Sequence, residues 1–543
     1  MTRHFNTTGH NLPTEHYSVD PFARITWSKL QRLIDAKKFF VVHAPRQSGK
    51  TTLLEAIVQR LNAEGHYAAM RMSVHSVQTA GSEWEKGIRT VADRLVLEAE
   101  DSFPDSWLSR EGPALVKTGS PGNLLMRMLR KWAATSEKPI VLLVDEIDAL
   151  VGDTLVSVLT QLRDGYIGRP KPFPQSVILC GVRDVREYRI HTSKGEIIAG
   201  GSCFNVKAES LRLGNFIEDE VHELYSQHTA ETGQGFDGSI HSKVMALTGG
   251  QPWLVNALAR ELTLNMPELR DRTRTITPDD VDEAKEQLIL RRDVHIDQLV
   301  DKLKEPRVRR VIEPILSSGE WAGYASEEDR MYAMDLGLVV EDREGGPRIA
   351  NEIYREVIPR VLTSTFQRDL EGQVRGKPYV LPDGRLEFRK MLEGFQQFYR
   401  ANADILRDLD LYGQATTQLI LQAWLQRVVN SGGLIEREYA LGTGRADLFV
   451  RHFHQENGGR GEQRFVLEIK VVRSRRSVET TIQEGLVQTA EYADRCNPEE
   501  AHLVVIDPRE RSWDEKIYVR ECVAPVLEGS SCQSGRAITV WGV

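Results

Sequence analysis

The stretch HAPRQSGKTTLLEAI, His43–Ile57, decides the fold of the N-terminal half of this chain. It follows the apolar run KFFVVHA and opens a helix, which is the context that a phosphate-binding loop requires. Gly49 lets the backbone approach phosphates, Lys50 would reach the β and γ phosphates, and the Thr51 hydroxyl would ligate Mg²⁺. Ala44 stands where a first glycine is expected, and it fits if it keeps a negative φ. The N–H groups expected to face phosphate oxygens are those of Gln47, Ser48, Gly49, Lys50 and Thr51, and Thr52 is also expected to bind the nucleotide.

A second motif, VLLVDEID, places two carboxylates at the end of another apolar strand. Asp145 would hold the metal through water, and Glu146 would polarise the attacking water. A Gly-Lys-Thr turn or an acidic strand end also occurs without any nucleotide. The two together, in this order and context, predict a site for ATP and Mg²⁺.

Composition describes an ordinary globular protein of several domains. The chain has 543 residues, 41% of them hydrophobic and 27% charged. Its net charge of -8 excludes general attraction to nucleic acid, so such contacts would need local basic patches. Five scattered cysteines indicate buried thiols in a reducing compartment. With no signal peptide and no apolar run of membrane-spanning length, we expect a cytoplasmic protein that does not contact membranes.

The pattern of apolar runs predicts an α/β multidomain chain. Buried parallel strands alternating with helices predict a parallel-sheet core, followed by helical segments. A helix leading into two strands joined by Glu-Gly-Gly predicts a winged helix, and a Gly- and Pro-rich stretch predicts a linker. The last part predicts a separate α/β domain. The expected limits are a lead at 1–16, the core at 17–213, a helical lid at 214–296, the winged helix at 297–365, linker and helix at 366–412, and the last domain at 413–543.

These motifs resemble the AAA+/STAND class of P-loop ATPases, and in particular bacterial AAA-like ATPases with the loop HAPRQxGKT. The resemblance covers about Tyr17–Leu362. It implies that CGVRDVR places Arg183 near the γ-phosphate as a sensor. It also implies that the turn Gly249–Pro252, with Gly250 and Pro252, starts the lid helix near the adenine. Arg183 as a surface ion-pair residue, and the turn as an ordinary helix start, are the simpler alternatives.

The last domain contains a second group of charged residues. GTGRADLFV, with Asp447, precedes the strand RFVLEIKVV, where Glu468 and Lys470 are two apart and therefore on one face. Two carboxylates and the Ile469 carbonyl suit Mg²⁺, with Mn²⁺ as an alternative. Lys470 could orient or deprotonate a water for phosphodiester hydrolysis. A cross-strand ion pair on a solvated face is the alternative.

This pattern resembles the PD-(D/E)xK nuclease superfamily over about Gly413–Asp507. The resemblance implies a role for Gln488 in the helix motif Gln-x-x-x-Tyr. It also implies nucleic acid, DNA rather than RNA, as the partner. Such domains carry a glutamate on the preceding helix, but here Gln414 or Gln418 stands in that place, with Glu436 or Glu438 as substitutes.

A basic run follows the second motif directly. Arg473, Arg475 and Arg476 could hold a phosphate backbone, or they form a solvated turn. Together the two resemblances imply an ATP-gated, Mg²⁺-dependent nuclease in defence against phage or mobile elements, with assembly into a homo-oligomer left open. The alternatives are a nucleotide-switched scaffold whose nuclease fold is inactive, and a transposition-type ATPase that binds DNA.

Overall fold

A computed structural model describes most of the chain in two compact units. One comprises Met1–Asp297, Arg330–Val340 and Ile349–Tyr354, and the other comprises Gln298–Asp329, Glu341–Arg348 and Arg355–Val543. The described residues are 3–81, 83–184, 189–191, 197–199, 204–291, 299, 301–318, 325–341, 346–362, 379–401, 421, 424–425, 433–437, 448–456, 459–472, 476–507, 509, 511–524 and 535–543.

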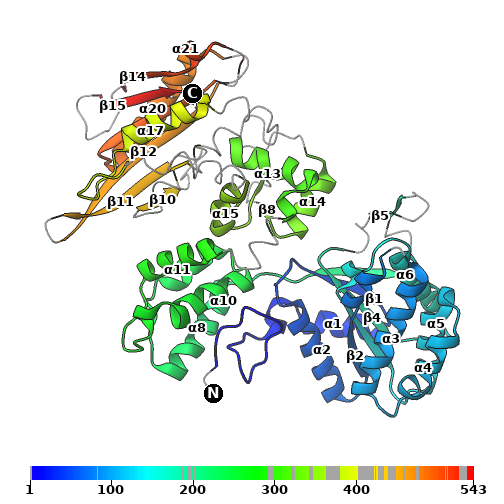
Figure 1. Ribbon diagram of the computed structural model, residues 1–543. Helices are drawn as coiled ribbons and strands as arrows, with labels where there is room; N and C mark the ends of the chain where they lie inside the picture. Colours follow the sequence, from blue (N-terminus) through cyan, green and yellow to red (C-terminus); the bar gives the residue numbers. More distant parts are fainter. Residues whose placement is uncertain are drawn as a thin grey trace. The chain divides into compact units, whose positions relative to one another are not determined.

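A five-stranded parallel sheet forms the centre of the first unit (Figure 1). Its order is β2-β3-β4-β1-β7. Strand β1 therefore lies between β4 and β7, although both of these strands come much later in the sequence than β1. Strands β1, β3 and β4 are almost wholly buried, because parallel strands covered on both faces must be apolar throughout. The strands are β1 (Phe39–His43), β2 (Ala68–Ser73), β3 (Ile140–Asp145), β4 (Ser176–Gly181) and β7 (Lys207–Arg212).

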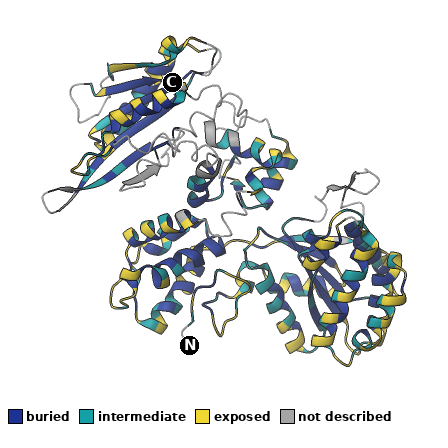
Figure 2. Cartoon of the chain, viewed as in Figure 1, coloured by how far each residue is buried: buried dark blue, intermediate teal, exposed yellow. Residues whose placement is uncertain are grey.

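Helices cover both faces of this sheet, and each face has its own apolar core (Figure 1). One core joins Phe40 and Val42 to helices α1 and α2, and the other joins Phe39 and Val41 to α3, α4, α5 and α6. The buried strands lie between helices whose outer faces are exposed (Figure 2). The helices are α1 (Trp27–Asp35), α2 (Lys50–Glu64), α3 (Trp84–Ser102), α4 (Trp107–Thr118), α5 (Leu124–Thr135) and α6 (Gly152–Ile167).

A helical segment completes the first unit. Gln251 caps the N-terminus of its central helix by accepting from the Leu254 N–H at 2.6 Å, and Pro252 occupies the first turn, where its missing N–H leaves no bond unmade. The helices are α8 (Glu218–Thr232), α9 (Ile240–Thr248), α10 (Pro252–Arg260) and α11 (Pro278–Arg291).

The next elements follow the order predicted for a winged helix. Two helices precede a short two-stranded hairpin, and a third helix follows it. The elements are α13 (Pro306–Ser318), α14 (Glu327–Asp335), β8 (Val339–Glu341), β9 (Pro347–Ile349) and α15 (Glu352–Leu362).

A mixed six-stranded sheet dominates the second unit, in the order β10-β11-β12-β13-β15-β14. Strands β10, β11 and β12 are antiparallel, and helix α20 then connects β12 to its parallel neighbour β13. Helix α17 packs on one face and α20 on the other, each with its own core. The elements are α17 (Phe388–Ala401), β10 (Gly433–Arg437), β11 (Leu448–Glu456), β12 (Gly459–Val471), α20 (Val478–Cys496), β13 (Glu500–Ile506), β14 (Tyr518–Val523) and β15 (Ala537–Gly542).

The predicted parallel-sheet α/β core is therefore confirmed. The last part is a sheet with helices on both faces, while its likeness to a nuclease stays a prediction, as do the domain limits. Among the described residues, no helix combines the length and apolarity that crossing a bilayer demands.

The contact between α6 and Phe173 allows a test of the packing in the core that contains α3, α4, α5 and α6. Gly165 of α6 faces the ring of Phe173, and a Cβ at this position would overlap three ring atoms. We expect Gly165→Ala to lower the free energy of unfolding by about 1–3 kcal/mol, because an aromatic ring held in a core moves only with backbone shifts. Gly122→Ala is the control, since a Cβ there meets nothing within 4 Å. Calorimetry of both variants checks this, and equal unfolding temperatures would contradict it.

Candidate nucleotide-binding site and a second charged cluster

The phosphate-loop sequence folds as a turn that connects β1 to α2. Gly49, the residue before α2, has a φ of 82°, and Gln47 has a φ of 55°. Left-handed residues that alternate with other backbone conformations turn successive N–H groups inward and create an anion-binding concavity at the helix N-terminus. Ala44 is fully buried and is not among the residues with positive φ, so it needs no glycine.

Lys50 folds back onto the loop that precedes it. Its ammonium donates to the carbonyl oxygens of Ala44 at 2.9 Å and Pro45 at 2.7 Å. Burial lowers the pKa of Lys50, because the low-dielectric surroundings disfavour the charged form. A bound phosphate would supply the negative charge that these neutral carbonyls lack.

Thr51 and Asp145 meet at the end of the sheet. The Thr51 hydroxyl donates to Asp145 Oδ2 at 2.9 Å, and the Glu146 N–H donates to Asp145 Oδ1 at 2.9 Å. Asp145 is 2% exposed, and burial raises the pKa of its carboxyl group. A hydroxyl and a carboxylate are hard oxygen ligands, and Mg²⁺ completes its shell with phosphate and water, so this pair fits Mg²⁺.

Glu146 lies beside Asp145 but turns toward another strand. Its φ is 59°, and its Oε2 accepts from the Ser73 hydroxyl at 2.6 Å. His75 Nδ1 lies 3.7 Å from Glu146 Oε1. The backbone strain of a non-glycine residue in the left-handed region holds this carboxylate at the carboxyl edge of the sheet, where the attacking water would be.

Sequence reasoning missed Arg24, which contacts the phosphate loop from the segment ahead of α1. Its guanidinium donates to the Ser48 carbonyl at 2.7 Å and lies 5.0 Å from the centroid of the Phe216 ring. Burial lowers the pKa of Arg24 to about 10. The only sequence signal is a lone arginine in PFAR ahead of the first helix, which carries no motif of its own.

The N-terminal lead was also missed as part of the site. It lines a cavity of about 110 Å³ beside Gln47, Gly49 and Thr52. The Asn11 N–H donates to the Thr52 hydroxyl at 3.2 Å, and Trp253 of α10 donates from Nε1 to the Thr7 carbonyl at 2.8 Å. The lead is thereby fixed to α2 and to the lid helix. Its residues have no periodicity, so their place was not readable from sequence.

The predicted lid turn lies at the phosphate loop. Gly250 has a φ of 69°, and a Cβ there would collide with the Phe216 carbonyl, so the glycine is required. Gln251 Nε2 donates to the Gln47 carbonyl at 3.3 Å, and Pro252 lines the cavity. The structure therefore brings this turn to the loop.

Arg183 follows β4 and stacks on a ring from the winged-helix segment. Its guanidinium carbon is 4.7 Å from the centroid of the Tyr332 ring. In the same segment Asp335 Oδ1 lies 3.7 Å from His43 Nδ1, and a Cβ at Gly337 would meet Pro45 within 2.9 Å. Residues on both sides of the phosphate loop thus contact this segment. The sensor role of Arg183 stays a prediction.

Glu468 and Lys470 form a buried ion pair in β12. Glu468 is 1% and Lys470 is 8% exposed. They pair with Leu503 and Val505 of β13, which belong to the core beneath α20, so both charges lie on the face that α20 covers. Ile469 points the other way, into the core beside α17. The solvated-face alternative therefore does not hold for this pair.

The structure describes two further residues predicted for this cluster, Gln488 and Arg476. Gln488 lies on α20, and its buried Oε1 has no hydrogen-bond donor among the described residues. Arg476 is engaged by Glu484 at 2.6 Å, as a solvated turn would allow. Within the described residues no three His, Cys, Asp or Glu side chains gather to hold a metal. Asp447, Arg473, Arg475, Gln414, Gln418 and Glu438 lie outside the described residues, and Glu436 lies in β10 without a described side chain.

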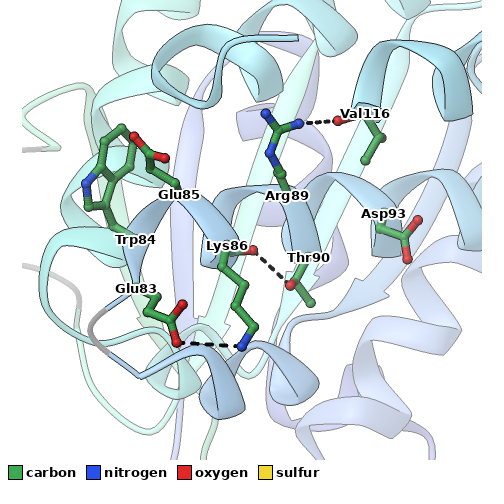
Figure 3. A pocket seen from close by; sticks show the side chains of 8 residues that line it. All are labelled: Glu83, Trp84, Glu85, Lys86, Arg89, Thr90, Asp93 and Val116. Carbon is green, nitrogen blue, oxygen red and sulfur yellow. Dashed lines mark hydrogen bonds and ion pairs between the residues drawn. The ribbon is translucent and has the colours of Figure 1, made fainter. Parts of the chain in front are cut away.

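Another hollow lies along α3, away from the phosphate loop (Figure 3). It is a shallow groove of about 710 Å³ that includes Trp84 and Asp93, and Lys86 lies 3.6 Å from Glu83 within it. None of the predicted site residues lines it, and its charges of both signs select no ligand.

Comparison with known proteins agrees with this geometry. Residues 32–188 match the family model of the AAA domain. This region is an AAA-type P-loop ATPase that binds ATP. No curated protein matches the sequence significantly.

Three solved structures match this chain at low sequence identity. A Walker-type ATPase of Pyrococcus abyssi is 14% identical with a TM-score of 0.44, covering 65% of this chain and 99% of its own. The ORC2 protein of Aeropyrum pernix, in ADPNP–ADP complexes, is 14% identical with a TM-score of 0.35, covering 64% and 93%. The RuvB Holliday junction branch migration motor of Thermotoga maritima is 12% identical with a TM-score of 0.32, covering 61% and 93%.

We expect that removing the charge of the buried Asp145 stabilises the fold and abolishes ATP hydrolysis. Folding raises the pKa of this carboxyl group above its ordinary value of 3.8. Its contribution to stability is therefore full at a pH below 3.8, and it is lost as the pH rises through the pKa of the folded state. At pH 7.5 without Mg²⁺, we therefore expect Asp145→Asn to raise the unfolding temperature by a few degrees, on the order of 1 kcal/mol. Mg²⁺-dependent ATP hydrolysis should be lost.

The exposed Asp93 supplies the control. Asp93→Asn should change neither the unfolding temperature nor the hydrolysis rate. An unfolding temperature of Asp145→Asn at or below that of the unchanged protein would show that the carboxylate is stabilising.

Proposed function

We propose that ATP binding at the phosphate loop controls a metal-dependent nuclease formed by the second unit. The observation that carries the nuclease half is the buried Glu468–Lys470 pair on the face of β12 beneath α20. Desolvating two charges is expensive and rarely retained for stability alone, since apolar residues of similar volume would serve as well. Ionisable groups kept in such a place are candidates for chemistry.

At the ATPase site, each residue has a role that its contacts support. Lys50 would exchange the Ala44 and Pro45 carbonyls for phosphate oxygens. Thr51 and Asp145 would hold Mg²⁺, which neutralises charge between the phosphates. Glu146 would release Ser73 and orient the attacking water.

At the nuclease site, Glu468 with Asp447 and the Ile469 carbonyl would hold Mg²⁺ or Mn²⁺, which polarises the phosphodiester. Lys470 would orient a water or stabilise charge at phosphorus, and Gln488 would reach the site from α20. Arg473, Arg475 and Arg476 would contact the backbone of the nucleic acid, DNA rather than RNA.

The domain organisation extends this proposal. The lead, core, lid and winged helix would form a STAND-like switch that assembles into homo-oligomers, and the last domain would cut nucleic acid in phage or mobile-element defence. The contacts of Tyr332 with Arg183 and of Asp335 with His43 support such a switch, because they connect the winged-helix segment to both sides of the phosphate loop.

A second candidate is a nucleotide-switched scaffold whose last domain does not cleave. The Glu468–Lys470 contact favours it, because the ammonium already neutralises the carboxylate that a metal would need.

Cleavage assays on near-isosteric variants separate the two candidates. Purified protein is incubated with double- and single-stranded DNA and with RNA, in Mg²⁺ or Mn²⁺, with and without ATP. We expect Glu468→Gln and Lys470→Met to lower the cleavage rate at least about 100-fold, because each removes a charge at the reacting phosphate. Lys50→Ala should abolish ATP binding and the effect of ATP on cleavage.

Glu462→Gln is the matched control, since Glu462 has the same parity on β12 and pairs with Arg451. Calorimetry confirms that each variant folds. Cleavage that persists in both variants would overturn the assignment of the nuclease site to Glu468 and Lys470. Cleavage that is absent under every condition, with intact ATP binding, would favour the scaffold.

A further inference from the structure

The cavity beside the phosphate loop has walls from three parts of the first unit. Gln47, Gly49 and Thr52 form the loop side, Asn6, Thr7 and Asn11 the lead side, and Trp253 and Asn256 the lid side. Because the phosphate-binding turn forms one wall, a nucleotide bound there would place its base at this cavity. The side chains of the cavity therefore face the base.

Asn256 has an unusual hydrogen-bonding state. It lies one turn into α10 and is 6% exposed. Its Nδ2 donates to the Pro252 carbonyl at 2.8 Å, whereas its buried Oδ1 has no hydrogen-bond donor among the described residues. The Pro252 carbonyl fixes the amide orientation, since a flipped amide would set two oxygens against each other. A buried acceptor without a donor is costly, and it is retained where a ligand supplies the donor.

The other two asparagines of the cavity do not share this property. Asn6 Nδ2 donates to Asn11 Oδ1 at 2.9 Å, and Asn6 Oδ1 accepts from the Thr8 N–H at 2.9 Å. Asn11 Nδ2 lies 3.4 Å from the Tyr17 carbonyl. These groups shape the lead itself, so Asn256 is the asparagine of the cavity whose amide oxygen a base can satisfy.

We infer that Asn256 Oδ1 accepts a hydrogen bond from the 6-amino group of adenine and thereby selects adenine nucleotides. Guanine and hypoxanthine carry an oxygen at position 6, which would set two acceptors against each other. This inference rests on the proposed binding of a nucleotide at Lys50 and Thr51, and it names the residue that determines the base.

Base analogues test this without altering the protein. The full chain is titrated by calorimetry with ADP, with purine riboside diphosphate, which lacks the 6-amino group, and with inosine diphosphate, which has oxygen there. Diphosphates avoid hydrolysis during the titration. We expect ADP to bind about tenfold more tightly than purine riboside diphosphate, and inosine diphosphate to bind more weakly still, as expected for one buried hydrogen bond.

The same titrations on Asn256→Leu complete a double-mutant cycle. The variant should bind ADP and purine riboside diphosphate equally, with purine riboside diphosphate bound within about twofold of its affinity for the unchanged protein. The matched control Asn265→Leu, in the same lid but not lining the cavity, should keep the preference for ADP.

The outcomes separate this inference from the proposed function. Equal binding of all three diphosphates to the unchanged protein, or an unchanged ADP preference in Asn256→Leu, overturns the role of Asn256 and leaves the nucleotide site standing. Absence of binding by any diphosphate overturns both.

Discussion

The hydrogen bond between Thr51 and Asp145 is the constraint on which the nucleotide site depends. It joins the first turn of α2 to the end of β3, two elements brought together only by the order of the parallel sheet. Asp145 is buried and its pKa is raised, so the folded chain holds a carboxylate in a place that disfavours its charge. Such stored destabilisation is typical of functional sites, where a ligand relieves it.

The same principle applies to the neighbouring groups. Among the described residues, the Lys50 ammonium donates to two neutral carbonyls of its own loop, and Asn256 holds a buried acceptor without a donor. Asn256 lines the cavity beside the phosphate loop, and Lys50 follows Gly49, which lines the same cavity. A purine nucleotide has a phosphate for the Lys50 ammonium and a hydrogen-bond donor for the Asn256 oxygen, so these two groups suit the same ligand.

In the second unit, the buried charges of Glu468 and Lys470 form an ion pair with each other. Glu468 and Lys470 neutralise each other beneath α20, and a metal would have to separate them. The Lys50 ammonium of the nucleotide site is hydrogen-bonded to neutral carbonyls, whereas the Lys470 ammonium of the second cluster is paired with the Glu468 carboxylate. A nucleotide can therefore bind without displacing a charged side chain, whereas a metal at the second cluster must first displace Lys470 from Glu468.

Local sequence determined much of the ATPase region. Strands buried on both faces are apolar throughout, so β1, β3 and β4 were readable from composition, and the loop between β1 and α2 was readable from Gly49-Lys50-Thr51. Asp145 followed from its place at a strand end, because the carboxyl ends of parallel strands share one edge. The same-face placement of Glu468 and Lys470 followed from the two-residue period of a strand.

Tertiary structure alone decided what surrounds these motifs. Arg24 and Asn11 come from segments without any motif, and Asn256 lies beyond the lid-turn motif, so only the packing of the lead and lid against α2 brings them to the loop. The burial of Glu468 and Lys470 likewise depends on α20 crossing their face, since a strand's alternation says which residues share a face but not whether that face is covered. Sequence patterns record contacts with near neighbours, whereas a cavity wall is made by residues that meet only after the chain has folded.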